Sequence, residues 1–336
     1  MREVAELNGD GIASELRDAI HLLNGALGQP VAFQPVDWSL EAREHTSAID
    51  AGVELCKALG AAMKYPTVTE SISPNQLLRD FLGLAVIHRP CRSYPGVSRN
   101  YTGDLDVHVV RVATGGTYED AGHRIGYHSA VSIRIMERTP VEHAAHFAFR
   151  LAERHRRQVV SASKYTIQQA ADGLFEEVVA EVAKEYRNTE HRRELFDALL
   201  AKLIIHPERF DVIVTPNEYG DFLSDAAYGL IGSIGLGASA SYAFTPSHQP
   251  SIGIFDPAGG TAPDIAGKGI ANPSGAIEAY GYLLEYLGHY DMGPKLIDAV
   301  RDSIGAGETT PDLGGTLNTM QFTEAVVQRV TGQAGA

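Results

Sequence analysis

Short apolar runs of strand length alternate along the chain with longer stretches in which apolar residues recur every three or four positions. The short runs are residues 85–87, 107–110, 159–161, 212–214 and 251–255. The longer stretches include residues 141–156 and 174–186, and their spacing places apolar side chains on one face of a helix. Strands that alternate with helices predict the α/β class.

The composition is that of an ordinary soluble protein. The chain has 336 residues, of which 44% are hydrophobic and 21% charged. Its length favours about two domains. No apolar stretch approaches the roughly 20 residues that span a bilayer, and the first residues lack the pattern of a secretory signal. With only Cys56 and Cys91, neither a disulfide framework nor a cysteine zinc site is expected. We therefore expect a cytoplasmic protein that does not enter a membrane.

Charge excludes some partners and favours others. The net charge of −14 argues against binding to nucleic acid or to an anionic membrane. Several arginines that converged on a pocket in so acidic a chain would suit a small polyanion, because guanidinium binds carboxylate or phosphate through two parallel hydrogen bonds. Five arginines fall within one short span of sequence, namely Arg79, Arg89, Arg92, Arg99 and Arg111.

Two carboxylates four residues apart, Asp221 and Asp225, follow the apolar run at residues 210–214. If a helix begins near Gly220, both lie on one face and present hard oxygen ligands to a single divalent ion. An acidic pair at this spacing is by itself more often a solvated helix face. The metal-site interpretation therefore depends on the rest of the chain.

Glycine-rich segments show no Rossmann signature. Residues 9–12 read Gly-Asp-Gly-Ile, which fits a phosphate loop or a plain turn, and residues 232–237 have their glycines in the wrong order for the dinucleotide fingerprint. Residues 259–273 are different, because they form a long glycine-rich segment that contains Asp264 and Asn272. Its small residues would let backbone N–H groups approach a ligand, and its carboxylate could accept hydrogen bonds from ribose hydroxyls.

This segment and the paired aspartates together resemble the β-decarboxylating dehydrogenases, the family of isocitrate and 3-isopropylmalate dehydrogenases. The match is strongest in residues 210–241 and 259–273, and family-like order extends through nearly the whole chain. The resemblance implies a two-domain isopropylmalate-dehydrogenase-like α/β fold with the active site between the domains. Residues 1–90 and 231–336 would form the first, cofactor-binding domain. Residues 91–230 would form the second domain, which carries the interface of a homodimer.

The resemblance also assigns the metal and catalytic positions. Asp221 and Asp225 match the family's metal-binding aspartates in the pattern GDxxSD, and Asp197 matches the aspartate that completes the metal site from the partner subunit. Tyr118 matches the catalytic tyrosine. Lys164, which follows the apolar run at 159–161, matches the catalytic lysine and would serve the neighbouring subunit's site. The implied metal is Mg²⁺ or Mn²⁺.

The substrate positions follow from two further motifs. Arg79 and Arg89 match substrate arginines in the pattern LRxxxxLxxxxRP, and Arg111 opens the motif that contains the catalytic tyrosine. Ser73 and Asn75 resemble the S-x-N-x-x-L-R segment of isocitrate dehydrogenases, in which these residues hydrogen-bond a distal carboxylate. Isopropylmalate enzymes carry apolar residues near this place, so the polar pair favours a third anionic arm. A loop cap is the other interpretation of the pair.

The cofactor implied by the resemblance is NAD. Asp264 occupies the position at which NAD-dependent members carry an acidic residue and NADP-dependent members carry Lys-Tyr. A carboxylate there favours ribose hydroxyls and repels a 2′-phosphate. The residues expected to bind the cofactor are Ile12, Gly259, Gly260, Thr261, Ala262, Asp264 and Asn272.

The chemistry implied by the family is oxidative decarboxylation of a 3-carboxy-2-hydroxy acid. Hydride goes to the nicotinamide, so a base is needed near the hydroxyl, and the metal lowers the hydroxyl pKa and stabilises the enolate left by loss of carbon dioxide. Tyr118 would reprotonate the enol, with Lys164 as base or relay. Arg111 and the metal would depress the pKa of that lysine.

The motifs of this chain combine features of isocitrate enzymes and of isopropylmalate enzymes, with several departures from the family pattern. Gly259 stands where the family usually has a histidine, Thr166 stands where it has an asparagine, and Tyr65-Pro66 replaces a Thr-Pro pair. The segment before Tyr118 is closer to the T-G-G-x-Y version of isopropylmalate enzymes. These departures bear on the identity of the substrate more than on the reaction class.

Two hypotheses follow. The first is a NAD-dependent oxidative decarboxylase of isocitrate or of an analogue with a distal carboxylate or phosphonate. Isopropylmalate, homoisocitrate and tartrate are alternative substrates of the same class. The second hypothesis is a catalytically silent member that acts as a regulatory subunit, against which the intact catalytic, substrate and metal positions argue.

Overall fold

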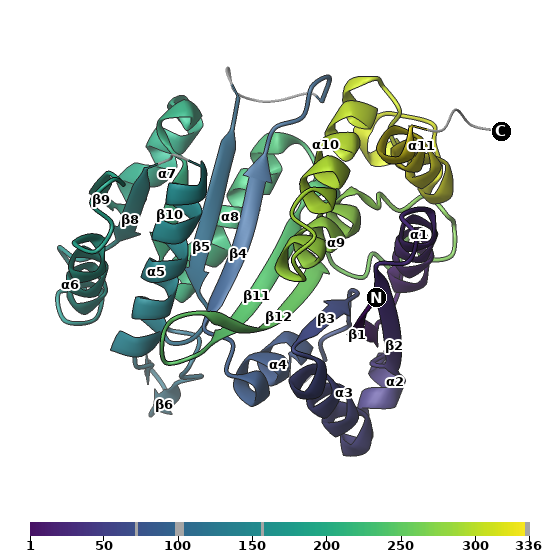
Figure 1. The fold of residues 1–336 in the computed structure, drawn as a ribbon. Coiled ribbons are helices and arrows are strands. Elements are labelled where there is room, and N and C mark those ends of the chain that lie inside the picture. Colours follow the sequence, from purple (N-terminus) through teal and green to yellow (C-terminus); the bar gives the residue numbers. More distant parts are fainter. Residues whose placement is uncertain (71–72, 98–103, 156–157, 333–336) are drawn as a thin grey trace.

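The computed structural model describes residues 1–70, 73–97, 104–155 and 158–332 (Figure 1). Arg99, of the arginine cluster, and Arg156, at the end of a predicted helix, lie outside these ranges. Within them, no helix is both long enough and apolar enough to span a membrane.

Ten strands form one mixed sheet, and a separate two-stranded hairpin stands apart from it. Strands at both ends of the large sheet are parallel to their neighbours, whereas β12, β11, β4 and β5 at its centre are antiparallel. In spatial order the sheet consists of β2 (Val31–Asp37), β1 (Arg2–Asn8), β3 (Ala61–Lys64), β12 (Pro250–Pro257), β11 (Ala238–Phe244), β4 (Val86–Arg92), β5 (Asp106–Val112), β10 (Val212–Thr215), β8 (Val159–Ser163) and β9 (His191–Leu195). The hairpin consists of β6 (His123–Ile125) and β7 (Ser129–Val131).

Helices cover both faces of the sheet. Figure 1 shows α5, α9 and α10 in front of the central strands and α8 behind them. The α-helices in the described ranges are α1 (Ala13–Ala26), α2 (Leu40–Arg43), α3 (Thr46–Leu59), α4 (Pro74–Leu82), α5 (Arg138–His155), α6 (Ala171–Ala183), α7 (Phe196–Ile205), α8 (Asn217–Ile231), α9 (Ser274–Tyr286), α10 (Met292–Gly305) and α11 (Thr319–Thr331). Helices on both faces of a largely parallel sheet confirm the α/β class.

The predicted strands are all present. The apolar runs lie in β4, β5, β8, β10 and β12, and the two periodic stretches correspond to α5 and α6. Every residue of β8 and β10 is buried, because helices cover both faces there. A strand buried on both faces reads as a continuous apolar run, which explains why these strands were predictable from sequence.

The central strands separate two sets of side chains. Ser241 of β11 pairs with Ile87 of β4, which in turn pairs with Arg111 of β5. Side chains in register across adjacent strands share a face, so these three point to one side of the sheet. Their chain neighbours, such as His88, point to the other side. Each of the three strands therefore lines two different regions.

The predicted domain boundaries fall inside regular elements. The boundary between residues 90 and 91 lies within β4, and that between 230 and 231 lies at the end of α8. The large sheet runs through both predicted parts without a break. The division into two domains stays a prediction.

Candidate active site

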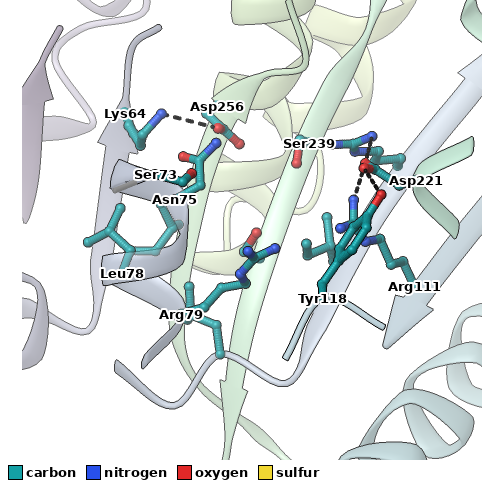
Figure 2. A pocket seen from close by; sticks show the side chains of 15 residues that line it. Lys64, Ser73, Asn75, Leu78, Arg79, Arg111, Tyr118, Asp221, Ser239 and Asp256 are labelled. Carbon is teal, nitrogen blue, oxygen red and sulfur yellow. Dashed lines mark hydrogen bonds and ion pairs between the residues drawn. The ribbon is translucent and has the colours of Figure 1, made fainter. Parts of the chain in front are cut away.

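A cavity of about 230 Å³ lies against the central strands, on the side of Arg111 (Figure 2). In Figure 2, Ser73, Asn75 and Arg79 lie on one side of it, with Tyr118 and Asp221 on the other. Both groups come from segments far apart in the sequence. The cavity brings together seven of the predicted site residues: Ser73, Asn75, Arg79, Arg89, Arg111, Tyr118 and Asp221.

Helix α4 supplies the first side of the cavity. Pro74 occupies its first turn, where the missing N–H costs nothing, and Gly83 ends it in the left-handed conformation. Asn75 and Arg79 are four residues apart and so share one face. Ser73 is in the N-cap position but its side chain makes no capping hydrogen bond. Ser73 therefore lines the cavity and is not the loop cap that the sequence allowed.

Helix α8 supplies the paired carboxylates. It begins at Asn217, earlier than the start predicted near Gly220, because Pro216 provides an extended residue just before the first turn. Asp221 and Asp225 both lie within the helix, and Nη1 of Arg89 is 3.3 Å from Oδ1 of each. The two carboxylates therefore face one point, as their spacing predicts. Carboxylate oxygens that converge in this way fit a hard divalent cation such as Mg²⁺ or Mn²⁺.

Arg111 anchors α8 to β5. It is 3% exposed, it forms an ion pair with Asp221, and its Nε donates to Oδ1 of Asn217 at 2.9 Å. A Cβ at Gly220 would lie 2.6 Å from the Cβ of Arg111, so only glycine permits this approach. Burial and then the charge of Arg89 lower the pKa of Arg111 to about 10. Arg111 still carries its charge at neutral pH.

Tyr118 is placed to hold a proton. Its hydroxyl donates to Oδ2 of Asp221 at 3.2 Å, and the Arg111 guanidinium lies 5.8 Å from the ring centroid. Partial burial and then the Asp221 carboxylate raise the pKa of Tyr118. The phenol therefore remains protonated at neutral pH and can act as an acid.

Lys164 and Asp197 do not line this cavity. Nζ of Lys164 lies 2.7 Å from Oδ1 of Asp197, and both side chains are partly exposed. The hydrogen bond from Lys164 lowers the pKa of Asp197. Across the described residues, no three His, Cys, Asp or Glu side chains gather closely enough to hold a metal ion. Asp197 of the same chain is thus not assembled with Asp221 and Asp225, and its role toward a neighbouring subunit stays a prediction.

Four polar residues of the cavity were not predicted from the sequence. Lys64 is 3% exposed, and its Nζ lies 3.6 Å from Oδ2 of Asp256. Burial lowers the pKa of Lys64, against the opposing effect of Asp256. Lys64 is the last residue of β3, and Asp256 is the last but one of β12. A charged residue at the end of an apolar strand is the signal that could have found each of them. Ser239 and Ser241 of β11 complete the group.

None of the predicted cofactor residues lines this cavity. The N–H of Ile12 donates to the carbonyl oxygen of Thr261 at 3.0 Å, which joins the turn at residues 9–12 to the glycine-rich segment. The N–H of Gly267 donates to Glu15 at 2.7 Å and ties the segment to α1. Asp264 is exposed. The side-chain amide of Asn272 donates to Asp312 at 3.0 Å.

This region fits a dinucleotide in its donor chemistry. Gly260 has open space around its Cβ position, and Gly259 has only distant contacts there, so a ligand can approach the backbone closely. The exposed carboxylate of Asp264 can accept from vicinal hydroxyls. Ala262 is held at φ +39°, a conformation that non-glycine residues seldom adopt.

Comparison with known proteins places the chain in one family. Residues 3–326 match the family model of isocitrate/isopropylmalate dehydrogenases. A 3-isopropylmalate dehydrogenase of Archaeoglobus fulgidus is 36% identical over 97% of this chain and 98% of its own length. A probable mitochondrial isocitrate dehydrogenase [NAD] subunit alpha of Caenorhabditis elegans is 33% identical over 98% of this chain and 92% of its own.

A solved structure gives the same result. The crystal structure of isocitrate dehydrogenase from Methylococcus capsulatus superimposes with a TM-score of 0.89 at 34% identity, and covers 98% of this chain and all of its own. The chain therefore belongs to the isocitrate/isopropylmalate dehydrogenase family, whose members are dehydrogenases.

Proposed function

We propose that this protein is a NAD-dependent, divalent-metal-dependent dehydrogenase that oxidatively decarboxylates a 3-carboxy-2-hydroxy acid. The preferred substrate is isocitrate or an analogue with a distal carboxylate or phosphonate. One observation carries this proposal. Three arginines, Tyr118 and Asp221, one of the two aspartates expected to bind the metal, line a single small cavity. Names of relatives that include "isocitrate dehydrogenase [NAD]" support the cofactor.

The cavity has a charge distribution suited to a tricarboxylate. Arg79, Arg89 and Arg111 supply three guanidinium groups for the two carboxylates next to the reacting carbons. Ser73 and Asn75 stand on the α4 side and would bind the distal anionic group. Lys64, buried in the same wall, adds a further positive group when protonated.

A second substrate class has its own support. Leu78, Leu84, Ile87 and Ile254 also line the cavity, and an apolar arm such as an isopropyl group could lie against them. A relative named 3-isopropylmalate dehydrogenase agrees with this alternative. The polar residues on α4 favour the anionic arm, because burying unpaired hydroxyl and amide groups against an isopropyl group would cost about 1–3 kcal/mol for each.

Each residue has a definite task in this proposal. When bound, the metal supplies Lewis acidity toward the hydroxy acid and NAD supplies a hydride acceptor. Asp221 and Asp225 would hold the metal, with Asp197 of a second subunit. The arginines orient the carboxylates. Tyr118 holds a proton on its phenolic oxygen and would deliver it to carbon after carbon dioxide leaves. Lys164 of a second subunit would accept the hydroxyl proton.

The experiment is a screen of NADH formation by the purified protein. Isocitrate, homoisocitrate, isopropylmalate, tartrate and phosphonomethylmalate are each tested with NAD and with NADP. We expect turnover with an anionic-arm substrate and NAD, its loss in EDTA, and its return with Mg²⁺ or Mn²⁺. Turnover that survives EDTA would refute the mechanism. Absence of NAD binding by calorimetry would instead favour the regulatory-subunit hypothesis.

A further inference from the structure

A second and larger cavity lies on the opposite face of the central strands. It has a volume of about 480 Å³ and is bounded by α5 on one side and by α9 and α10 on the other. Figure 1 shows α5 on one side of β4 and β5 and shows α9 and α10 on the other. Small-molecule pockets commonly enclose about 300–1,000 Å³, so the size suits a ligand. We call it the rear cavity.

Strand alternation separates the rear cavity from the candidate active site. His88 of β4, His108 of β5 and Tyr242 of β11 line the rear cavity, whereas Arg89, Arg111 and Ser241 line the active site. The members of the two sets occupy positions of opposite parity on the same strands, and such side chains point to opposite faces. The rear cavity is therefore not an extension of the active site.

Aromatic rings form much of the rear-cavity wall. Phe147 of α5 lies 5.1 Å from the Tyr242 ring, and Tyr242 lies 6.1 Å from Tyr286 of α9. Tyr282 meets the His88 ring edge-on at 5.6 Å, and Tyr290 is 67% exposed beside them. Faces and edges of several rings in one cavity favour a planar ligand that stacks on them.

Positive charge stands at the rim of this aromatic wall. Three arginines and two carboxylates line the rear cavity: Arg92, Arg150, Arg154, Glu285 and Asp298. Arg92 donates to Asp106 at 3.1 Å, while Arg150 donates to the carbonyl oxygen of His248. In the described part of the chain, no carboxylate forms an ion pair with Arg150. Arg92 and Arg154 each have a carboxylate partner, so Arg150 is the arginine of this lining that can pair with an anionic group of a ligand.

An ion pair crosses the gap between the helices. Nη1 of Arg154 on α5 lies 3.9 Å from Oε2 of Glu285 on α9, and the Arg154 side chain is 63% exposed. The pair is long and the Arg154 guanidinium is largely exposed, so Arg154 has N–H donors left for the anionic group of a ligand.

We propose that the rear cavity is a second binding site, for a planar aromatic molecule that carries one carboxylate or phosphate group. The ring lies against the wall formed by Tyr242, Tyr286 and Tyr290, and the anion meets Arg150 and Arg154. The ligand would contact α5 and α9 at once and so fix their separation. The proposal does not rest on the proposed function, since binding is measured without turnover.

The test is calorimetric titration of the full chain with naphthyl phosphate and with naphthoate, which distinguish phosphate from carboxylate. Naphthalene methanol serves as the uncharged analogue. We expect at least one anion to bind and the neutral analogue to bind about tenfold more weakly, because it lacks a charge-assisted hydrogen bond. Saturating isocitrate and NAD should leave the affinity unchanged. Failure of both anions to bind, or equal affinity for the neutral analogue, would overturn the proposal.

Variants locate the binding. Arg150→Gln removes a guanidinium that has no carboxylate partner among the described residues, and Tyr290→Ala removes an exposed ring, so each should weaken binding about fivefold or more. Arg138→Gln is the matched control, because Arg138 is an exposed arginine at the other end of α5 and already pairs with Glu177 and Glu181. Thermal unfolding checks that each variant folds. Displacement of the probe by isocitrate or NAD, or its loss in Arg79→Gln, would place it in the active site and refute the proposal.

Discussion

Arg79 differs from the other two arginines of the candidate active site. Arg89 and Arg111 already contact the carboxylates of α8, whereas Arg79 forms no ion pair among the described residues. Burial lowers the pKa of Arg79, against the opposing charges of Asp80 and Asp221. A group in this state gains most from a substrate carboxylate.

We therefore expect Arg79→Gln to raise KM by about 10- to 100-fold, the loss of a charge-assisted hydrogen bond of roughly 1.5–3 kcal/mol. The KM of Arg79→Lys should lie between those of wild type and Arg79→Gln, because lysine keeps the positive charge but cannot donate two parallel hydrogen bonds to one carboxylate. Steady-state kinetics with the substrate found in the screen measures this. Arg17→Gln, a substitution of a surface arginine paired with Asp18, is the control. An unchanged KM in Arg79→Gln would show that Arg79 does not bind substrate.

Glu278 is a buried carboxyl outside the active site. It is 4% exposed and accepts a hydrogen bond from the hydroxyl of Tyr94. Burial, only partly opposed by that hydrogen bond, raises the pKa of Glu278 to about 7. Between its ordinary pKa and about 7, the folded state binds more protons than the unfolded state. Stability from this group is therefore lost as pH rises through that window.

The variant Glu278→Gln should remove this pH dependence. It keeps the acceptor for Tyr94 and carries no charge. Relative to wild type, its free energy of unfolding should increase between about pH 4.5 and about pH 8 by up to about 3 kcal/mol. Urea unfolding at the two pH values measures this, with the exposed Glu54→Gln as control. A constant difference between Glu278→Gln and wild type would mean that the pKa of Glu278 is the same in the folded and unfolded states.

Sequence motifs could identify the acidic pair, the arginines and Tyr118, because these lie in a fixed order along the chain. They could not reveal the pair of Lys64 and Asp256. These residues belong to strands from opposite ends of the sequence, and only the pairing of β3 with β12 brings them together. Their contact depends on the tertiary fold, so it cannot be predicted from the local sequence pattern.

At the scale of elements, the approach of α8 to β5 sets the geometry of the site. Gly220 is buried against Arg111, whereas Gly229 on the same helix is exposed and has nothing within 4 Å of its Cβ position. Alanine has the higher helix propensity at both positions. The two glycines therefore form a matched pair in which only steric contact differs.

We expect Gly229→Ala to stabilise the protein by about 0.5–1 kcal/mol and to leave activity unchanged. Gly220→Ala should instead destabilise it by about 1–3 kcal/mol, because the new methyl group pushes α8 from β5. Since α8 carries Asp221 and Asp225, activity should fall as well. Urea unfolding and turnover of both variants test this. If Gly220→Ala is as stable and active as Gly229→Ala, close packing of α8 does not position the carboxylates.

The elements themselves were predictable to different degrees. Strands β8 and β10 are buried throughout, so their apolar runs were plain in the sequence. Strand β9 reads His-Arg-Arg-Glu-Leu and was not predicted. It lies at the edge of the sheet, where charged residues prevent pairing with another chain. These charged residues replace the apolar run by which a strand is usually predicted.

At the scale of the whole molecule, the two catalytic residues of the proposal lie apart. Tyr118 lines the cavity, while Lys164 pairs with Asp197 outside it. The hairpin of β6 and β7 exposes Ile125, Tyr127 and Val131, and apolar groups of this kind favour contact with another subunit. We therefore propose a homodimer in which each site takes Lys164 from the partner.

Mixed dimers test this arrangement. Tyr118→Phe and Lys164→Ala should each be nearly inactive, but a mixed dimer has one site with both wild-type residues. Random mixing should then restore about a quarter of wild-type activity. Tyr118→Phe mixed with Arg111→Gln is the control and should restore nothing, because both substitutions affect groups of one chain's cavity. Absence of recovery in the first mixture would show that the sites are not shared.

Because β4, β5 and β11 carry functional side chains on both faces, they restrict which insertions and deletions this chain can tolerate. Removing one residue from β4 before His88 would turn Arg89 away from Asp221 and carry its neighbours to the opposite face. One such deletion would dismantle the walls of two cavities together. Insertions in the connecting loops would leave both cavity walls in place. The lengths of β4, β5 and β11 are therefore constrained by both faces of the sheet at once.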